Sequence, residues 1–395
     1  MQLFLLLFLL ANACSMVGGS EVLFGACTMT VTEGGILERS GECNDESGGL
    51  FLGALGISSI APGAFDRMAG VTALDLSGNL ISSLPSSGLP PNLVSLSLHD
   101  NKLTNIEGQL NCPDLLQLSL SRNSIATISG GAFQQLGHLK YLHLDSNLLD
   151  SLPGGLFDAL IALKGLDLSH NKITCLPTSM FDSLKNLEML SLSFNQISAL
   201  GPGINVTSWV EIRSLPKLTR LFLDHNRIQI FPASVFYNCS GLKRIELQSN
   251  RIASLPPALF FRLRSLEYVA MAENNIPLLP PDLFKNSPGV IFLDLSDNAM
   301  TRAGIADDFF GRSRSLREVY LGGNDLECLP MHAPQFQVIW ESPSIRMTAS
   351  SKCHIDFAGP VRLHGNPSPL PLRVRAHGSR RWSVRCVCRW QVQGF

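Results

Sequence analysis

One short pattern of apolar and polar positions repeats along most of the chain. It reads L-x-L-x-x-N-x-I in the stretch Leu166-Asp167-Leu168-Ser169-His170-Asn171-Lys172-Ile173. The asparagine recurs at gaps of 22 to 26 residues, with one gap of 31, at Asn79, Asn101, Asn123, Asn147, Asn171, Asn195, Asn226, Asn250, Asn274, Asn298 and Asn324. A period of this length is typical of stacked repeats that share one continuous core.

The residue types of the pattern predict its local structure. Two leucines separated by one residue lie on the same face of a short strand, so stacked units would form a parallel sheet. The asparagine comes where the chain leaves this strand and turns. Because its amide group carries two donors and one acceptor, it can satisfy backbone groups that would otherwise be buried without partners. The eleven asparagines therefore predict a structural ladder.

The fuller units resemble those of a known family. From Leu166 to Leu187 the chain reads LxLxxNxIxxLPxxxFxxLxxL, which is similar to the "typical" 24-residue class of extracellular leucine-rich repeats. The resemblance covers roughly residues 50 to 329. It implies an α/β solenoid, a horseshoe with a parallel concave β-sheet and a convex side of irregular, 3-10 or short helical segments. It also implies that partners bind the concave sheet, without naming one.

Five regions are expected along the chain. These are a signal peptide at 1–20, an N-terminal cap at 21–49, a solenoid of about 12 repeats at 50–329 with an insertion near 201–209, a C-terminal cap at 330–360 and a basic tail at 361–395. Leu55 replaces the asparagine in the first, degenerate unit, as is common in terminal repeats. On the convex side, phenylalanines such as Phe133, Phe157 and Phe181 recur nine residues before the next strand and predict a stacked spine.

The start of the chain and its cysteines indicate secretion. An apolar run, Leu3 to Leu10, precedes small residues, as in a signal peptide, with cleavage after Ala13 or near Gly19 left open. Cysteines flank both ends of the solenoid, and we expect Cys27–Cys43 and Cys328–Cys353 disulfides to close the caps. The repeat alignment places Cys112 and Cys239 at buried leucine positions, whereas Cys175 falls at an exposed one. Its pairing, and that of Cys386 and Cys388, stays open.

Two sequons also fit an extracellular protein. The seven-residue insertion between Asn195 and Asn226 holds Asn205-Val206-Thr207, and a second sequon is Asn238-Cys239-Ser240. We expect Asn205, and with weaker support Asn238, to carry glycans. The inserted loop is either a partner contact or a tolerated decoration.

The solvent-facing positions of the predicted strands change in character along the chain. They are small and polar in the early repeats and become aromatic or charged from the middle onward. Clustered aromatics and arginines are typical of interface hot spots. The predicted ligand-binding residues are Met189, Phe194, Arg220, Phe222, Arg244, Glu246, Tyr268, Phe292 and Tyr320.

The sequence supports catalysis or metal binding less well than it supports ligand binding. Ser119, His143 and Asp167 share one outward column, but an open sheet offers no evident oxyanion donors or water-excluding pocket, so no catalytic residue is assigned. His143 with Asp145 and His170 could make a weak cation site, yet no metal ligands are assigned. No cofactor is expected.

Composition limits the partners. Hydrophobic residues make up 45% of the chain and the net charge is −1, which argues against disorder and against a nucleic-acid binder. No later stretch is long and apolar enough to span a membrane. Residues 331–395 carry nine Lys or Arg against two Asp or Glu. The tail is therefore expected to be disordered, and it is either a solvated segment of no function or a site for an anionic glycan. The sequence thus favours a secreted, non-enzymatic protein that binds a protein ligand; the alternatives are an inhibitor of a secreted enzyme and a glycan-binding matrix scaffold.

Overall fold

The computed structural model describes residues 15–16, 21–41, 43, 48–84, 88–177, 179–198, 212, 215–232, 235–257, 259–301, 304–306, 309–310, 315–326 and 337–339. They belong to two compact units. The N-terminal unit comprises residues 1–197 and 210–218, and the C-terminal unit comprises residues 198–209 and 219–395. Each unit is described by itself below.

The N-terminal unit begins with a small sheet at the place of the predicted cap. Its strand order is β1 (Ser15–Met16), β2 (Glu21–Phe24), β3 (Cys27–Val31), β4 (Ile36–Gly41) and β6 (Ser59–Ile60). The first four strands are antiparallel, and β6 joins β4 in parallel. Alternate residues of β3 point into the core, and the Cys27–Cys43 disulfide joins β3 to the segment after β4. This is the bridge that the sequence predicts.

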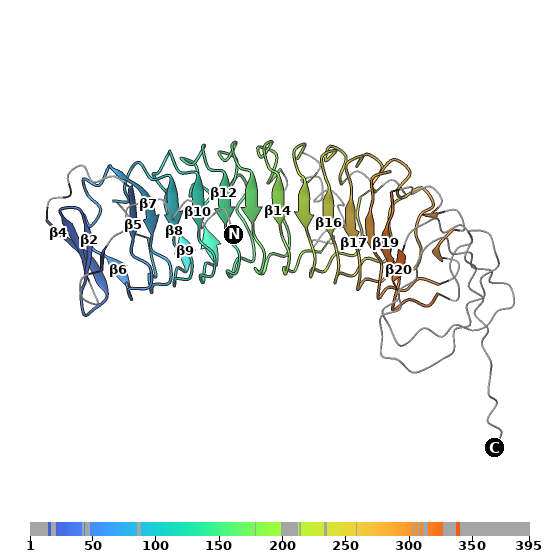
Figure 1. Cartoon of the computed structure of the whole chain (residues 1–395), viewed down its shortest axis with the longest axis horizontal. Helices are drawn as coiled ribbons and strands as arrows, with labels where there is room; N and C mark the ends of the chain where they lie inside the picture. The colour runs from blue at the N-terminus through green and yellow to red at the C-terminus, as the bar shows by residue number, and fades with distance from the viewer. Residues whose placement is uncertain are drawn as a thin grey trace, which may run out of the picture. The chain divides into compact units, whose positions relative to one another are not determined.

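The main sheet of the N-terminal unit consists of one short strand per repeat. Its strands are β5 (Gly48–Phe51), β7 (Val71–Asp75), β8 (Ser95–Ser97), β10 (Gln117–Ser119), β12 (Tyr141–His143), β13 (Gly165–Asp167) and β14 (Met189–Ser191), each parallel to the next (Figure 1). The central leucines stand in register, as Leu142 does with Leu166, and are fully buried. The leucine-rich solenoid is therefore confirmed in this unit.

The C-terminal unit repeats the arrangement. Strands β15 (Arg220–Phe222), β16 (Arg244–Glu246), β17 (Tyr268–Ala270), β18 (Phe292–Asp294), β19 (Glu318–Tyr320) and β20 (Gln337–Ile339) are parallel and pair in chain order. Their central residues Leu221, Ile245, Val269, Leu293 and Val319 are fully buried. The outer positions of each strand consequently face away from the core.

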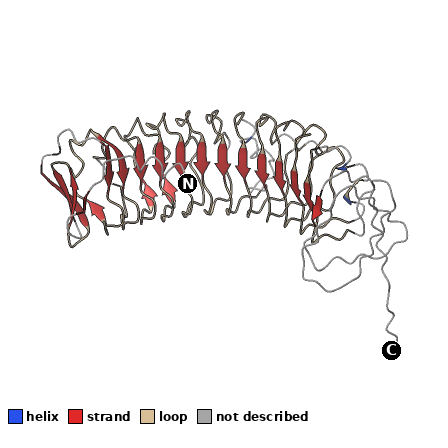
Figure 2. Ribbon diagram, in the orientation of Figure 1, coloured by secondary structure: helices blue, strands red, loops and turns tan. Residues whose placement is uncertain are grey.

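The other side of each repeat returns through turns. Figure 2 shows strands and loops with almost no helix, and no α-helix occurs in the part of the chain that the structure describes. In the N-terminal unit, the two 22-residue units that end near Asn101 and Asn123 lack the phenylalanine. A two-stranded parallel sheet pairs β9 (Asn105–Ile106), in the second of these units, with β11 (Thr127–Ile128) in the next unit, which carries Phe133.

Stacked phenylalanine rings fill the space behind the main sheet. In the N-terminal unit Phe157 lies between Phe133 and Phe181, with ring centroids 6.5 and 6.3 Å apart and nearly parallel rings. In the C-terminal unit Phe236, Phe260 and Phe284 continue the same pattern at 6.1 and 5.4 Å. The spine expected from sequence thus exists in both units. At its C-terminal end Phe284 meets Phe309 edge-on, and Phe309 contacts Phe310.

The asparagine ladder joins each repeat to the one before it. Asn171 is typical: its Nδ2 donates to the carbonyls of Leu168 in its own repeat and Leu144 in the preceding repeat, at 3.1 and 3.0 Å. Its Oδ1 accepts from the backbone N–H of Leu149 at 3.0 Å. Every other ladder asparagine donates to the carbonyl three residues before it. Buried backbone groups are therefore satisfied by one side chain per repeat.

The residue before each asparagine adopts a left-handed backbone conformation. Its φ is 52° at His170 and 54° at Phe194, and glycine takes the same conformation at Gly78 and Gly323. Left-handed φ is uncommon for residues with a Cβ, and rarer still for bulky ones. The turn that aims the asparagine into the core thus imposes backbone strain on its neighbour.

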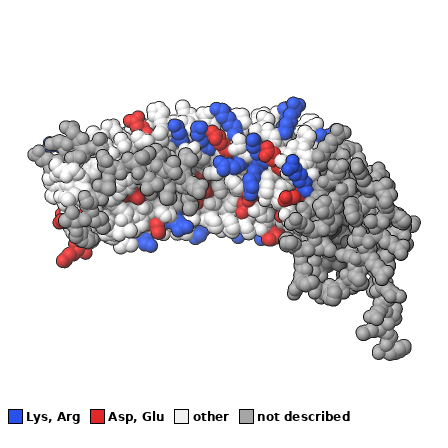
Figure 3. Space-filling view, in the orientation of Figure 1, with Lys and Arg blue, Asp and Glu red and all other residues white. Residues whose placement is uncertain are grey.

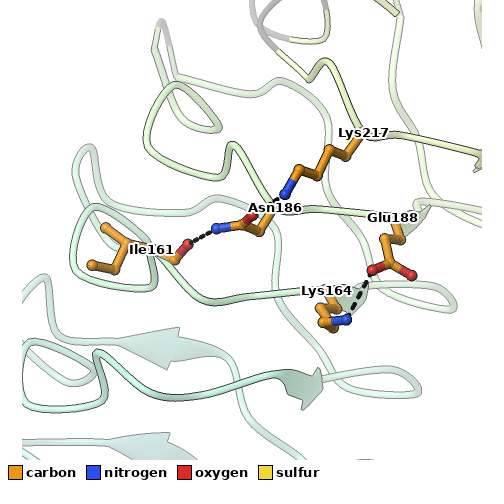
Figure 4. A network of polar contacts seen from close by, with 5 residues as sticks. All are labelled: Ile161, Lys164, Asn186, Glu188 and Lys217. Carbon is orange, nitrogen blue, oxygen red and sulfur yellow. Dashed lines mark hydrogen bonds and ion pairs between the residues drawn. The ribbon is translucent and has the colours of Figure 1, made fainter. Parts of the chain in front are cut away.

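Surface charges of opposite sign lie beside one another. Figure 3 shows Lys and Arg side chains interspersed with Asp and Glu on the face in view. In the N-terminal unit Lys164 and Glu188 form an exposed ion pair at 3.0 Å, and Lys217 Nζ donates to Asn186 Oδ1 at 2.7 Å (Figure 4). Such exposed pairs contribute little to stability.

Three further cysteines of the described residues differ in accessibility. Cys112 and Cys239 are fully buried, as their alignment with leucines predicts, and Cys175 is exposed. Burial raises the pKa of the Cys112 thiol to about 11.

These environments predict selective alkylation. Because the thiolate is the reactive form, native protein at pH 8 should react with a thiol-specific reagent at Cys175 at least tenfold faster than at Cys112 or Cys239. Peptide mapping by mass spectrometry would measure the three rates. Unfolding in denaturant is the control and should equalise them; equal rates in the native protein would contradict the assigned burial.

Several sequence predictions lie outside the described residues. They are most of the signal peptide, the Cys328–Cys353 bridge, the Asn205 sequon with its insertion, the cysteines Cys386 and Cys388, and the basic tail. Strand β1 falls inside the segment assigned to the signal peptide. No helix among the described residues has the length and apolar character needed to cross a bilayer.

Candidate functional site

The outer strand positions of the C-terminal unit form two columns. The first runs Arg220, Arg244, Tyr268, Phe292 and Glu318 in register across β15 to β19. The second runs Phe222, Glu246, Ala270, Asp294 and Tyr320. The sheet thus brings together seven of the nine predicted ligand-binding residues on one face. It adds Asp294 and Glu318, which the same repeat alignment could have identified.

A chain of side-chain contacts runs along this face. The Arg244 guanidinium lies over the Tyr268 ring, with its Cζ 3.8 Å from the ring centroid. Tyr268 stacks on Phe292, with centroids 4.2 Å apart and rings inclined by 4°, and Phe292 contacts Tyr320 at 5.2 Å. We call Arg244, Tyr268, Phe292 and Tyr320 the aromatic platform. Cross-strand pairs on one sheet face stabilise each other, so the platform is ordered before any partner arrives.

Glu246 holds the arginine of the platform in place. Arg244 Nε donates to Glu246 Oε1 at 2.6 Å, and Gln248 Nε2 donates to Glu246 Oε2 at 3.2 Å. The Glu246 side chain is 14% exposed and that of Arg244 is 41% exposed. Gln248 was not singled out from sequence, although it follows Glu246 at the next same-face position. The guanidinium therefore presents charge to solvent in a fixed orientation.

The electrostatics of the platform keep its tyrosine neutral. Burial raises the pKa of Tyr268, and this outweighs the opposing effect of the Arg244 charge. Near neutral pH the phenol therefore retains its proton and can donate a hydrogen bond. A half-buried arginine, phenol and phenyl ring in contact are the residue types that dominate interface energetics.

Met189 and Phe194 belong to the N-terminal unit. Met189 occupies the first position of β14, whereas Phe194 lies in the turn after it, immediately before Asn195. The Phe194 ring is 42% exposed and stacks on the imidazole of His170, with centroids 4.2 Å apart. The repeat period places His170 and Phe194 in equivalent left-handed turns, so these two side chains form a column beside the sheet, whereas Met189 lies on it.

The polar residues of the N-terminal unit also fall into register. Ser119, His143 and Asp167 are cross-strand neighbours on β10, β12 and β13, in the column that their spacing predicts. His143 lies close to Asp145, as proposed from sequence, but its other neighbour is Asp167 rather than His170. His170 instead faces Phe194.

The Asn238 sequon lies on a turn of the C-terminal unit. Asn238 and Ser240 are exposed, while Cys239 between them is buried. Burial of the middle residue therefore does not bury the acceptor amide.

Comparison with known families matches the repeats directly. The leucine rich repeat family model matches residues 91–149, 137–197 and 216–276. Together with the parallel strand stack and its asparagine ladder, these matches show that the chain has a leucine-rich repeat fold. Comparison with curated protein sequences gave no match.

Solved structures share the fold. A leucine-rich repeat protein of Leptospira interrogans is 25% identical, with a TM-score of 0.52, and the match covers 68% of this chain and 73% of that one. A chain of the TLR13–ssRNA13 complex is 23% identical (TM-score 0.55), covering 69% of this chain and 43% of that one. A chain of the Drosophila Toll–Spatzle complex is 23% identical (TM-score 0.59), covering 69% and 35%. The chain thus spans less than half the length of these two receptor-complex chains.

Proposed function

We propose that the protein is a secreted, non-enzymatic recognition protein that binds a protein ligand on the outer sheet face of its C-terminal unit. The observation that carries this proposal is the aromatic platform. Its arginine is held by Glu246, its rings stack in register, and all of them remain partly accessible. A contiguous, partly accessible aromatic surface is typical of a site that a partner covers.

Other features support the extracellular part of the proposal. The Cys27–Cys43 disulfide is of the kind that persists in oxidising compartments. The exposed Asn238 sequon gives an accessible acceptor for a glycan. Among the similar structures, Toll is complexed with Spatzle, and TLR13 with single-stranded RNA. The mixed charges around the platform favour a protein over a nucleic acid, because strong phosphate binding requires clustered basic residues.

Capture with matched variants tests the site. Full-length protein would be immobilised, exposed to extracellular fluid from the source tissue, and the retained proteins identified by mass spectrometry. The test variant is Tyr268→Ala with Phe292→Ala. The control is Tyr237→Ala with Phe261→Ala, which removes the same ring types from side chains that are 46% and 47% exposed in the same unit.

The expected result is at least one protein retained by the wild type and the control but lost, by tenfold or more, with the test variant. Loss of a hot-spot aromatic costs about 2 kcal/mol or more of binding energy, which exceeds the roughly 1.4 kcal/mol of a tenfold change. Identical retention by all three proteins would show that the platform is not the binding site. Assaying retained enzymes with and without added protein separates simple recognition from inhibition.

A further inference from the structure

A second cluster of functional side chains lies on the N-terminal unit, away from the aromatic platform in sequence and chemistry. It consists of His143, Asp145 and Asp167, all half-buried. One ligand atom from each residue, an imidazole nitrogen or a carboxylate oxygen, lies within 4.8 Å of the other two.

The repeat itself brings these residues together. His143 on β12 and Asp167 on β13 are direct cross-strand neighbours in the parallel sheet. Asp145 follows His143 by two residues and therefore projects from the same face. Three ligands thus come from backbone whose register is fixed by buried leucines on the opposite face, rather than from mobile loops.

Neighbouring serines orient both carboxylates. Ser121 Oγ donates to Asp145 Oδ1 at 2.5 Å. Ser169 donates to Asp167 Oδ1 twice, from its Oγ at 2.7 Å and from its backbone N–H at 3.0 Å. Hydrogen bonds of this kind around metal-binding carboxylates hold the ligand atoms in position before the ion binds.

The charge of the cluster favours a cation. In the described part of the chain, neither aspartate forms an ion pair with a lysine or arginine. The two carboxylates therefore repel each other without a compensating basic side chain, which favours a bound cation.

We propose that His143, Asp145 and Asp167 bind one divalent transition-metal ion, with Zn²⁺ the best match. One imidazole nitrogen and two carboxylate oxygens suit zinc, which accepts three protein ligands with a water in the fourth position. Ca²⁺ and Mg²⁺ prefer sites made of oxygen alone, so they fit less well. The fourth position faces solvent, because the cluster is on the outer face of the sheet. This site does not depend on the function proposed for the C-terminal unit.

Zinc titration of the full-length protein tests the proposal. Protein stripped with a chelator would be titrated with ZnCl₂ in a calorimeter, and in parallel with CoCl₂ while the visible absorption is recorded. The variants are His143→Ala and Asp167→Asn, the latter nearly the same size as the wild-type residue. The control is His170→Ala, which removes an imidazole one repeat further along that stacks on Phe194.

The wild type and His170→Ala should bind one more equivalent of Zn²⁺ than His143→Ala. Asp167→Asn should raise the dissociation constant for that Zn²⁺ ion at least tenfold, and the visible absorption of the cobalt complex should fall in parallel. Circular dichroism melting of metal-free samples would check that the variants fold. Zinc binding of equal stoichiometry and affinity in the wild type and both test variants would overturn the proposal, as would wild-type binding that is lost equally in His170→Ala.

Discussion

Replacing Asn171 by alanine is expected to destabilise the N-terminal unit by about 3–5 kcal/mol. The side chain satisfies the buried carbonyls of Leu144 and Leu168 and the buried N–H of Leu149. Alanine would leave these groups without a partner in a position that water cannot reach, and each unsatisfied group costs about 1–3 kcal/mol. Urea unfolding followed by circular dichroism would measure the loss.

Asn186 provides the matched control. It is a half-buried asparagine of the same unit with two solvent-exposed hydrogen bonds: its Nδ2 donates to the Ile161 carbonyl and its Oδ1 accepts from Lys217 (Figure 4). Water can replace Asn186 as the hydrogen-bond partner of both groups, so Asn186→Ala should lower the free energy of unfolding by about 0.5 kcal/mol or less. Equal effects of the two substitutions would mean that the ladder adds nothing beyond ordinary surface hydrogen bonds.

Removing one phenylalanine ring from the spine is expected to cause the second large loss of stability. Phe157 is fully buried between Phe133 and Phe181, and Phe157→Ala should reduce the free energy of unfolding by about 3–5 kcal/mol. The loss combines the transfer energy of the ring with the cavity that rigid neighbours leave behind. Unfolding in urea, under conditions that keep the Cys27–Cys43 disulfide intact, gives the value.

Ile161 tests whether burial causes that loss. It lies four residues after Phe157 on the same side of the repeat, but its side chain is 60% exposed. Ile161→Ala should change stability by no more than about 0.5 kcal/mol. A Phe157→Ala variant as stable as Ile161→Ala would contradict the packing described for the spine.

The stacked fold could be predicted from sequence because its determinants are periodic. Leucine positions such as Leu142 and Leu166 fix strand register, and every unit repeats the same evidence. The left-handed turn before each asparagine gives no comparable signal, since the position accepts residues as different as His170, a type enriched in this conformation, and Phe194, a bulky type that rarely adopts it. Their stacking is therefore visible only once the turn geometry is known.

In the candidate sites, too, some contacts could be predicted from sequence and others could not. Register alone places Arg244 beside Tyr268 and His143 beside Asp167, so both neighbourhoods follow from the repeat. Side-chain conformation does not follow from it. The guanidinium could have pointed to solvent instead of over the ring, and the position of the His170 imidazole, which stacks on Phe194 and not on His143, depends on the turn that carries it.

The ladder also has a direction. Each asparagine reaches back to the preceding repeat, which explains why Leu55 can replace it in the first unit: Asn79 supplies the acceptor for the Leu55 and Ile57 N–H groups and a donor for the Leu52 carbonyl. A nascent chain emerging from the ribosome therefore completes each turn only when the following turn has been synthesised. Pauses in translation would leave a single unfinished turn at the growing end, with the finished turns behind it already closed.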